Sequence, residues 1–216
     1  MQTAALLRPP VADETAWDAH RPPPGCYLHD AHGLHGMGHA ARVLVWAELI
    51  ARSMRDEGID VDIAAVRWAA ALHDVRRLHD GRDALHGARC GVWIGEHGCK
   101  ALAGLSESRR ARIAYCCTWH VPPDRQAPAM TPELMCLKDA DALDRVRLGG
   151  PDVRMLRTPL ARSLVGQARF LFTLSMVRGG DPWRAVRDVA RHMGLWAPMA
   201  DTEANAQRCR LRHFRC

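Results

Sequence analysis

Apolar residues recur at helical spacing in one segment of this chain after another, and this pattern limits the possible folds more than any other feature. A first helix is predicted from about His39 to Met54, because one face there would be apolar: Val43, Trp46, Ala47, Ile50 and Met54. Similar spacing predicts a second helix that begins at Asp60 or Asp62 and reaches about His73, and further helices at about 83–97 and 106–120. No segment between residues 30 and 200 has the pattern of a strand pair. We therefore predict an all-α fold, a single-domain bundle of about six to eight helices.

Three further helix starts share a capping residue followed by proline. They are Thr131-Pro132, Thr158-Pro159 and Asp181-Pro182. Proline suits the first helical position, where its missing N–H would have no partner in the helix. Helices are expected from these points to about Arg147, Val177 and Met193.

The chain is long enough for one well-filled domain. Residues 8–25 hold five prolines, so residues 1–28 are predicted to form an extended, proline-rich lead-in. Residues 29–196 are predicted to be the helical domain. Residues 197–216 are expected to be a basic tail, which carries Arg208, Arg210, Arg212 and Arg215.

The formal charge of +6 suits an anionic substrate or nucleic acid, but net charge alone is explained as well by a solvated basic surface. There is no dense block of Lys and Arg and no alternation of basic and aromatic residues, so nucleic acid is not an expected partner. The sequence has no membrane-spanning stretch and no signal-peptide pattern at its start. The expected location is therefore cytoplasmic, with the eight cysteines reduced and mostly packed. Oligomeric state is not determined by these features.

Polar groups interrupt the apolar faces of four predicted helices. His39, His73, His120 and Asp141 all fall on such faces. Burying them without partners would cost several kcal/mol each. A divalent cation removes this cost, because imidazole and carboxylate are its natural ligands. Any single histidine here could be a core residue with ordinary hydrogen bonds, but the set favours a metal site.

Three segments resemble the HD superfamily of metal-dependent phosphohydrolases. They are His39-Ala40-Ala41-Arg42-Val43, the His73-Asp74 pair, and residues 138–144, which read KDADALD. The resemblance spans residues 35–148 and implies that His39, His73, Asp74 and Asp141 hold a metal ion. Periodicity does not choose between Asp141 and Asp139, which lies on a second apolar stripe. The A-D-x-L segment of the family favours Asp141.

Two further histidines extend the resemblance. The run from His73 to Arg77, with His86-Gly87 downstream, is similar to an HDxxR branch of the superfamily, and His120 falls where two-metal members place a ligand. The alternatives are a helix-face residue near solvent for His86 and a helix C-terminal residue favoured by the helix dipole for His120. If both bind metal, the expected cofactor is two divalent ions per chain instead of one, from among Mn, Fe, Co and Zn.

Other residues near these motifs could act on a substrate. Asp74 could orient the attacking water, and Arg77 or Lys138 could neutralise phosphate charge. His35 could contact the substrate or transfer a proton. Arg42 could position the site or pair with Asp144. Some HD nucleotidases carry an acidic residue where this chain has Arg77, which argues against a direct transfer of their single-metal mechanism.

The resemblance predicts hydrolysis of a phosphate ester by metal-activated water, with a nucleotide or similar small phosphorylated metabolite as the substrate. A phosphomonoesterase or nucleotidase is preferred. One alternative is a di-iron oxygenase that uses the same six ligands, with Tyr27 near an open iron position. Another is a nucleotide-binding module without catalysis.

Overall fold

The fold was analysed in a computed structural model that describes residues 14–96, 98 and 100–195. Within these residues the chain has nine α-helices and no strand. Their bounds are α1 Glu14–Ala19, α2 Met37–Asp56, α3 Ile63–Leu72, α4 His86–Glu96, α5 Glu107–Trp119, α6 Pro132–Asp144, α7 Pro159–Ser163, α8 Val165–Arg178 and α9 Pro182–His192. Five 3₁₀ turns lie between them: η1 Pro24–Cys26, η2 Lys100–Leu102, η3 Asp124–Gln126, η4 Arg145–Leu148 and η5 Val153–Met155. The all-α prediction is confirmed.

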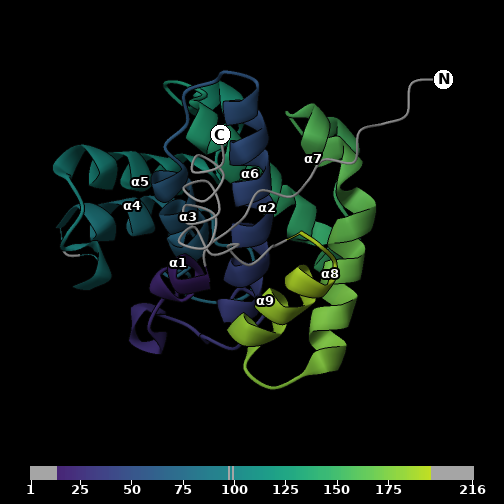
Figure 1. The fold of residues 1–216 in the computed structure, drawn as a ribbon. Coiled ribbons are helices and arrows are strands. Elements are labelled where there is room, and N and C mark those ends of the chain that lie inside the picture. The colour runs from purple at the N-terminus through teal and green to yellow at the C-terminus, as the bar shows by residue number, and fades with distance from the viewer. Residues whose placement is uncertain (1–13, 97, 99, 196–216) are drawn as a thin grey trace, which may run out of the picture.

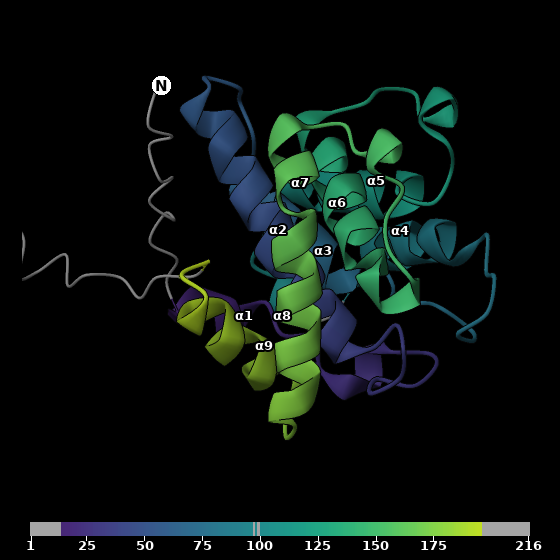
Figure 2. The ribbon, with the colours of Figure 1, turned by 90° about the vertical axis from the view of Figure 1, so that its right-hand side faces the viewer.

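Helix α2 is the centre of the bundle. It packs against α3, α6 and α9, and in Figure 1 it lies between the α4–α5 pair on one side and α8 and α9 on the other. Its apolar face, which includes Val43, Trp46 and Ile50, is fully buried. Figure 2, turned by 90°, shows α8 running along the bundle with α9 beside it. The core therefore surrounds the helix that carries His39.

Capping side chains set the helix starts where the sequence predicted them. The side chain of Asp62 accepts a hydrogen bond from the backbone N–H of Ala65, and four other helices begin in the same way, with Ser106, Thr131, Thr158 and Asp181. Each cap satisfies an N–H group that has no partner within its helix.

The prediction that residues 1–28 form an extended lead-in is wrong in part. Residues 14–19 form α1, and the ring of Trp17 lies 5.1 Å from that of Trp183 in α9. The predicted helix from residue 158 to 177 is broken at Leu164 into α7 and α8. These two differences raise the helix number above the expected six to eight. The basic tail at residues 197–216 lies outside the described residues.

The third helix begins later than predicted, at His86 and not at Asp83. The carboxylate of Asp83 instead accepts hydrogen bonds from the backbone N–H groups of Leu78 and Leu85 and pairs with Arg89. This arrangement closes the loop that follows the His73-Asp74 pair and places His86 in the first turn of α4.

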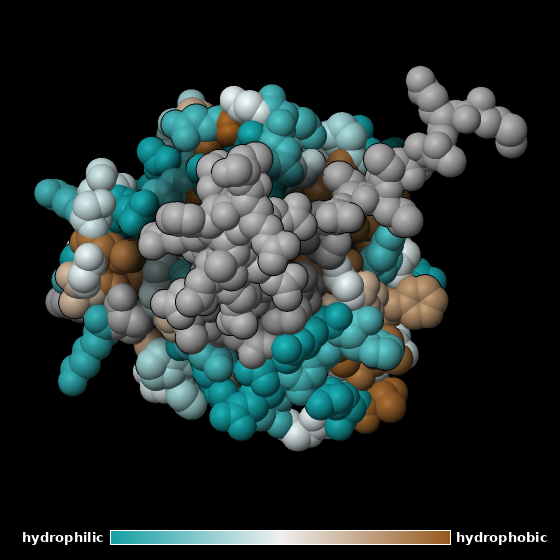
Figure 3. All heavy atoms as spheres, viewed as in Figure 1, coloured by the Kyte–Doolittle hydropathy of each residue, from teal (hydrophilic) through white to brown (hydrophobic). Residues whose placement is uncertain are grey.

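On the face drawn in Figure 3 the described surface is mostly polar, and apolar side chains appear at its left-hand edge and at its lower right, over α8. Phe170, Met176 and Val177 of this helix are more than half exposed. None of the described helices is both long and apolar enough to cross a membrane. Cys90, Cys116, Cys117 and Cys136 are buried and form no disulfide, as expected for packed thiols.

Candidate metal centre

His39 enters the core through a close turn before α2. A Cβ atom on Gly36 would lie 2.2 Å from the carbonyl oxygen of Ala31, so only glycine fits where the helix begins. The His39 Nδ1 atom lies 2.8 Å from Asp144 Oδ2. Asp144 also accepts a hydrogen bond from Arg42 Nε at 2.6 Å, so the predicted Arg42–Asp144 pair is confirmed. Although burial alone would raise it, the Arg42 charge and the His39 hydrogen bond lower the pKa of Asp144 to about 2.

His73 and Asp74 follow α3 directly. The His73 Nδ1 atom lies 2.9 Å from the carbonyl oxygen of Ala70, and its Nε2 atom lies 3.0 Å from Nε2 of His39. Burial lowers the pKa of His73 to about 3, against the opposing effect of the Asp74 charge. The ring is therefore neutral at pH 7, which is the form that binds metal.

A second imidazole pair lies between α4 and α5. Nε2 of His86 is 3.0 Å from Nε2 of His120. Their Nδ1 atoms point away from each other, toward the carbonyl oxygens of Asp83 at 2.5 Å and of Cys117 at 2.6 Å.

Two glycines allow α4 to approach α5 closely enough for this pair. A Cβ atom on Gly87 would lie 2.6 Å from the carbonyl oxygen of Cys117, and one on Gly91 would lie 1.9 Å from Thr118 Oγ1. Larger residues would separate the two helices. The His86–His120 distance thus depends on these glycines.

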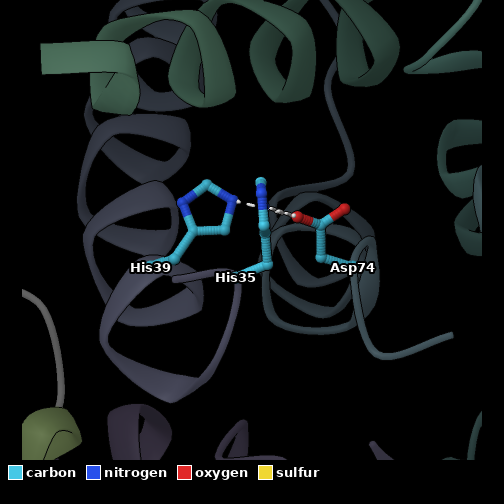
Figure 4. Close-up of side chains that lie close together, drawn as sticks. All are labelled: His35, His39 and Asp74. Atoms are coloured by element: carbon cyan, nitrogen blue, oxygen red, sulfur yellow. Dashed lines mark hydrogen bonds and ion pairs between the residues drawn. The ribbon is translucent and has the colours of Figure 1, made fainter. Parts of the chain in front are cut away.

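Asp74 lies between the two imidazole pairs, with one carboxylate oxygen toward each. Its Oδ1 atom is 2.8 Å from His86 Nε2, and its Oδ2 atom is 3.4 Å from His39 Nε2. Oδ2 is also 2.8 Å from His35 Nδ1, and Figure 4 shows the rings of His35 and His39 facing this carboxylate. Although burial alone would raise it, the surrounding imidazoles, above all His73, hold the pKa of Asp74 well below its ordinary value.

These donors fit a divalent cation. The four imidazoles that form the two pairs each have Nδ1 beside a carbonyl or carboxylate oxygen. In its neutral form each ring therefore carries its proton on Nδ1 and turns a bare Nε2 inward. Bare nitrogens and an ionised carboxylate repel one another unless a positive charge lies between them. Nitrogens about 2.1 Å from one ion and at roughly right angles would be about 3.0 Å apart, which matches both Nε2–Nε2 distances.

The structure brings Asp141, and not Asp139, to the imidazoles. Asp141 Oδ1 lies 3.4 Å from His39 Nε2 and 3.9 Å from His73 Nε2, and one set of side chains that could hold an ion is His39, His73 and Asp141. The fully buried Asp139 accepts hydrogen bonds from the backbone N–H groups of Arg157 and Thr158. These hydrogen bonds hold the segment before α7 against α6.

A cavity of about 980 Å³ opens beside this cluster. Its wall includes five of the predicted site residues that bear imidazole or carboxylate: His35, Asp74, His86, His120 and Asp141. The two predicted phosphate-binding cations, Arg77 and Lys138, also line it.

Both of these cations already have partners. Arg77 donates to the carbonyl oxygen of Gly81 at 2.6 Å and lies 3.6 Å from Asp74 Oδ1. Lys138 Nζ donates to the carbonyl oxygen of Pro122 at 2.5 Å and lies 3.1 Å from Asp124 Oδ1. Tyr27, considered as a guard of an open iron position, is not among the residues that line this cavity.

Arg147 was missed by the sequence analysis. Its side chain is 3% exposed, lines the cavity, and has a terminal nitrogen 3.1 Å from His35 Nδ1. It also donates to the carbonyl oxygen of Asp144 at 3.0 Å. The signal available in the sequence was its position three residues after Asp144.

Comparison with known families identifies the region that holds this cluster. The family model of the HD domain matches residues 36–146. Searches of curated proteins and of solved structures gave no match. The matched region covers just over half of the chain and contains both imidazole pairs, Asp74 and Asp141. The chain therefore belongs to the HD domain family, within the superfamily of metal-dependent phosphohydrolases.

Proposed function

We propose that this protein hydrolyses a phosphate ester of a nucleotide or similar small metabolite by means of metal-activated water. The observation that carries the proposal is the position of Asp74, whose two oxygens face two separate imidazole pairs beside an open cavity. In this proposal His39, His73 and Asp141 hold one ion, His86 and His120 hold a second, and Asp74 is shared. When bound, such ions polarise the phosphoryl group and lower the pKa of water, so that water can act as a nucleophile near neutral pH.

The protein side chains bind and orient the substrate. Arg77 and Lys138 line the cavity and offset the charge of the phosphate oxygens. Asp74 orients the attacking water. His35, which is hydrogen-bonded to Asp74 and forms part of the same wall, transfers a proton.

The test begins with metal content. Protein stripped with a chelator and reloaded with Mn, Fe, Co or Zn should bind two ions per chain. It should then release phosphate from members of a panel of nucleoside monophosphates and sugar phosphates under anaerobic conditions. His39→Ala and Asp74→Asn should abolish release, whereas His192→Ala, on the exposed face of α9, should not change it. A fully loaded protein that releases phosphate from no member of the panel would refute the proposal.

The di-iron oxygenase remains the second candidate, because four imidazoles and two carboxylates in one cluster also suit two iron ions. The hydroxyl of Tyr27 is buried and has no hydrogen-bond partner in the described part of the chain. Burial, with the Asp74 charge as the next contribution, raises the pKa of this hydroxyl, so it stays protonated. Oxygen uptake by the iron-loaded protein, without anaerobic phosphate release, would select this candidate. Tight nucleotide binding with neither reaction would select a binding module.

A further inference from the structure

Three arginines from separate segments line the cavity that contains the metal-binding cluster. Arg82 lies in the loop after the His73-Asp74 pair, Arg125 in η3, and Arg145 in η4. All three are exposed. None of their side chains forms a hydrogen bond or ion pair with another residue in the part of the chain that the structure describes. Their guanidinium groups are therefore available to a ligand.

The other charges of the wall are largely matched. Asp124 pairs with both Arg157 and Lys138, and Asp152 pairs with Arg154. Asp80 also lines the wall and lies 3.7 Å from His29. Seven Arg and Lys side chains against five carboxylates still leave an excess of positive charge around the cavity. Such an excess attracts anions, and the planar fork of arginine matches the oxygens of a phosphate or carboxylate.

The wall therefore offers two kinds of chemistry. Imidazoles and carboxylates, suited to metal ions, come from the region of Asp74 and Asp141, while the unmatched guanidinium groups come from residues 82, 125 and 145. The volume of about 980 Å³ is at the upper end for sites that take small organic ligands. It is more than a single phosphate group needs.

We propose that Arg82, Arg125 and Arg145 form an outer anion-binding subsite, and that the ligand of this cavity is a phosphate ester with a second anionic group. The second group is a phosphate or a carboxylate. The proposal rests on the function proposed above only in placing the first phosphate at the metal centre.

Binding of matched probe pairs to the full chain tests this subsite. Adenosine 3′,5′-bisphosphate and adenosine 5′-monophosphate differ by one phosphate, and 2-phosphoglycerate and glycerol 2-phosphate differ by one carboxylate. Calorimetry on the metal-loaded protein should give at least about tenfold tighter binding for the more anionic member of one pair. The phosphate pair and the carboxylate pair distinguish the two sources of the second charge.

Variants then test whether the arginines cause this difference. Arg125→Gln/Arg145→Gln should weaken binding of the preferred probe about tenfold and change binding of its singly phosphorylated partner less than about twofold. Arg55→Gln is the matched control, because Arg55 is an exposed arginine at the end of α2 that does not line the cavity. It should leave both affinities unchanged.

Two results would overturn the inference. In the first, the wild-type protein does not discriminate within either pair, and this measurement does not depend on how the variants fold. In the second, the double variant weakens the binding of both members of a pair equally. The arginines would then act through a diffuse electrostatic field and would not form a subsite. A protein that discriminates between the probes but hydrolyses no phosphate ester would keep the subsite and refute only the proposed function.

Discussion

His39 and Asp144 are joined by a buried hydrogen bond of 2.8 Å between Nδ1 and Oδ2. This bond fixes the imidazole so that Nε2 faces His73 and Asp141. Arg42, one turn along α2, donates to the same carboxylate and compensates its charge. A candidate metal ligand on α2 is therefore oriented by a carboxylate at the end of α6, and the core around these two helices is coupled to the candidate metal centre.

Asp144→Asn should weaken both the fold and the site. The variant leaves the buried Arg42 guanidinium without its counter-ion, which should lower the free energy of unfolding by about 3 kcal/mol. It also weakens the hydrogen bond that orients His39, so metal affinity should fall about 10- to 100-fold. Urea unfolding of the metal-free protein and a metal titration measure the two effects.

Asp188→Asn is the control for this change. Asp188 pairs with Arg178 at the surface, where ion pairs contribute under about 1 kcal/mol. Should Asp144→Asn behave like this control in both measurements, Asp144 neither neutralises Arg42 nor orients His39.

Asp62 at the start of α3 predicts a pH dependence of stability. Although burial alone would raise it, the hydrogen bonds from Arg109 and from the Ala65 N–H lower the pKa of Asp62. Because the folded-state pKa is depressed, the stabilisation is present above the unfolded value of about 3.9 and is lost as pH falls below it.

Asp62→Asn separates this charge from the cap itself, since asparagine caps helices as well as aspartate does. With solvent screening of this partly exposed group, the variant should be less stable by about 0.5–1 kcal/mol at pH 7. The difference should vanish once the pH falls below the depressed pKa of Asp62. Urea unfolding at pH 7 and at a pH below that pKa, both at low salt, measures it. An equal difference at the two pH values would mean that the charge of Asp62 does not contribute.

Most helix starts could be predicted from the sequence because a cap depends on residues that are close to one another in the chain. Thr131 and Asp181 cap α6 and α9 by accepting hydrogen bonds from backbone N–H groups only three residues later, and a proline follows each cap. Helix α1 is only six residues long, too short for a periodic signal, and it packs through Trp17 onto Trp183 near the other end of the chain. Such a long-range contact cannot be inferred from the composition of residues 1–28.

The candidate site was predictable to the extent that its residues lie on apolar helix faces, as His39 and His73 do. The choice between Asp139 and Asp141 was not, because α6 directs one toward the segment before α7 and the other toward α2. Arg147 follows α6 in a 3₁₀ turn, where the period changes from 3.6 to 3 residues. Helical periodicity therefore gives no side-chain direction there.

Gly87→Ala should selectively damage the second imidazole pair. The added methyl would lie 2.6 Å from the carbonyl oxygen of Cys117, which forces α4 away from α5 and moves His86 from His120. Metal analysis should then show one ion per chain, against the two that are proposed for the wild type. Gly95→Ala is the control on the same helix, because a Cβ there meets nothing within 4 Å. It should bind two ions and gain about 0.5–1 kcal/mol in stability, as alanine favours helix over glycine.

A Gly87→Ala protein that still binds two ions would show that α4 and α5 adjust without separating the pair. If the variant and Gly95→Ala both lost one ion, the effect would come from α4 as a whole and not from its contact with α5.

Asp139→Asn should mainly lower stability and Asp141→Asn should mainly lower metal affinity, although the two residues lie close together on α6. Asp139 is fully buried and accepts hydrogen bonds from the backbone and guanidinium of Arg157 and from Thr158. An asparagine there would turn an amide NH₂ group toward these donors. Arg157 would keep its pair with Asp124, so the free energy of unfolding should fall by about 1–3 kcal/mol. The metal stoichiometry of this variant should remain that of the wild type.

Asp141 contacts the imidazoles of His39 and His73. Burial alone would raise the pKa of Asp141, but these two imidazoles, His39 above all, lower it. Asp141→Asn should weaken metal binding at least about tenfold. It should destabilise the metal-free protein less than Asp139→Asn does, because the Asp141 side chain is 31% exposed and solvent screens its charge. Urea unfolding of the metal-free proteins and equilibrium dialysis with manganese would measure both quantities, and the reverse pattern would place the metal on Asp139.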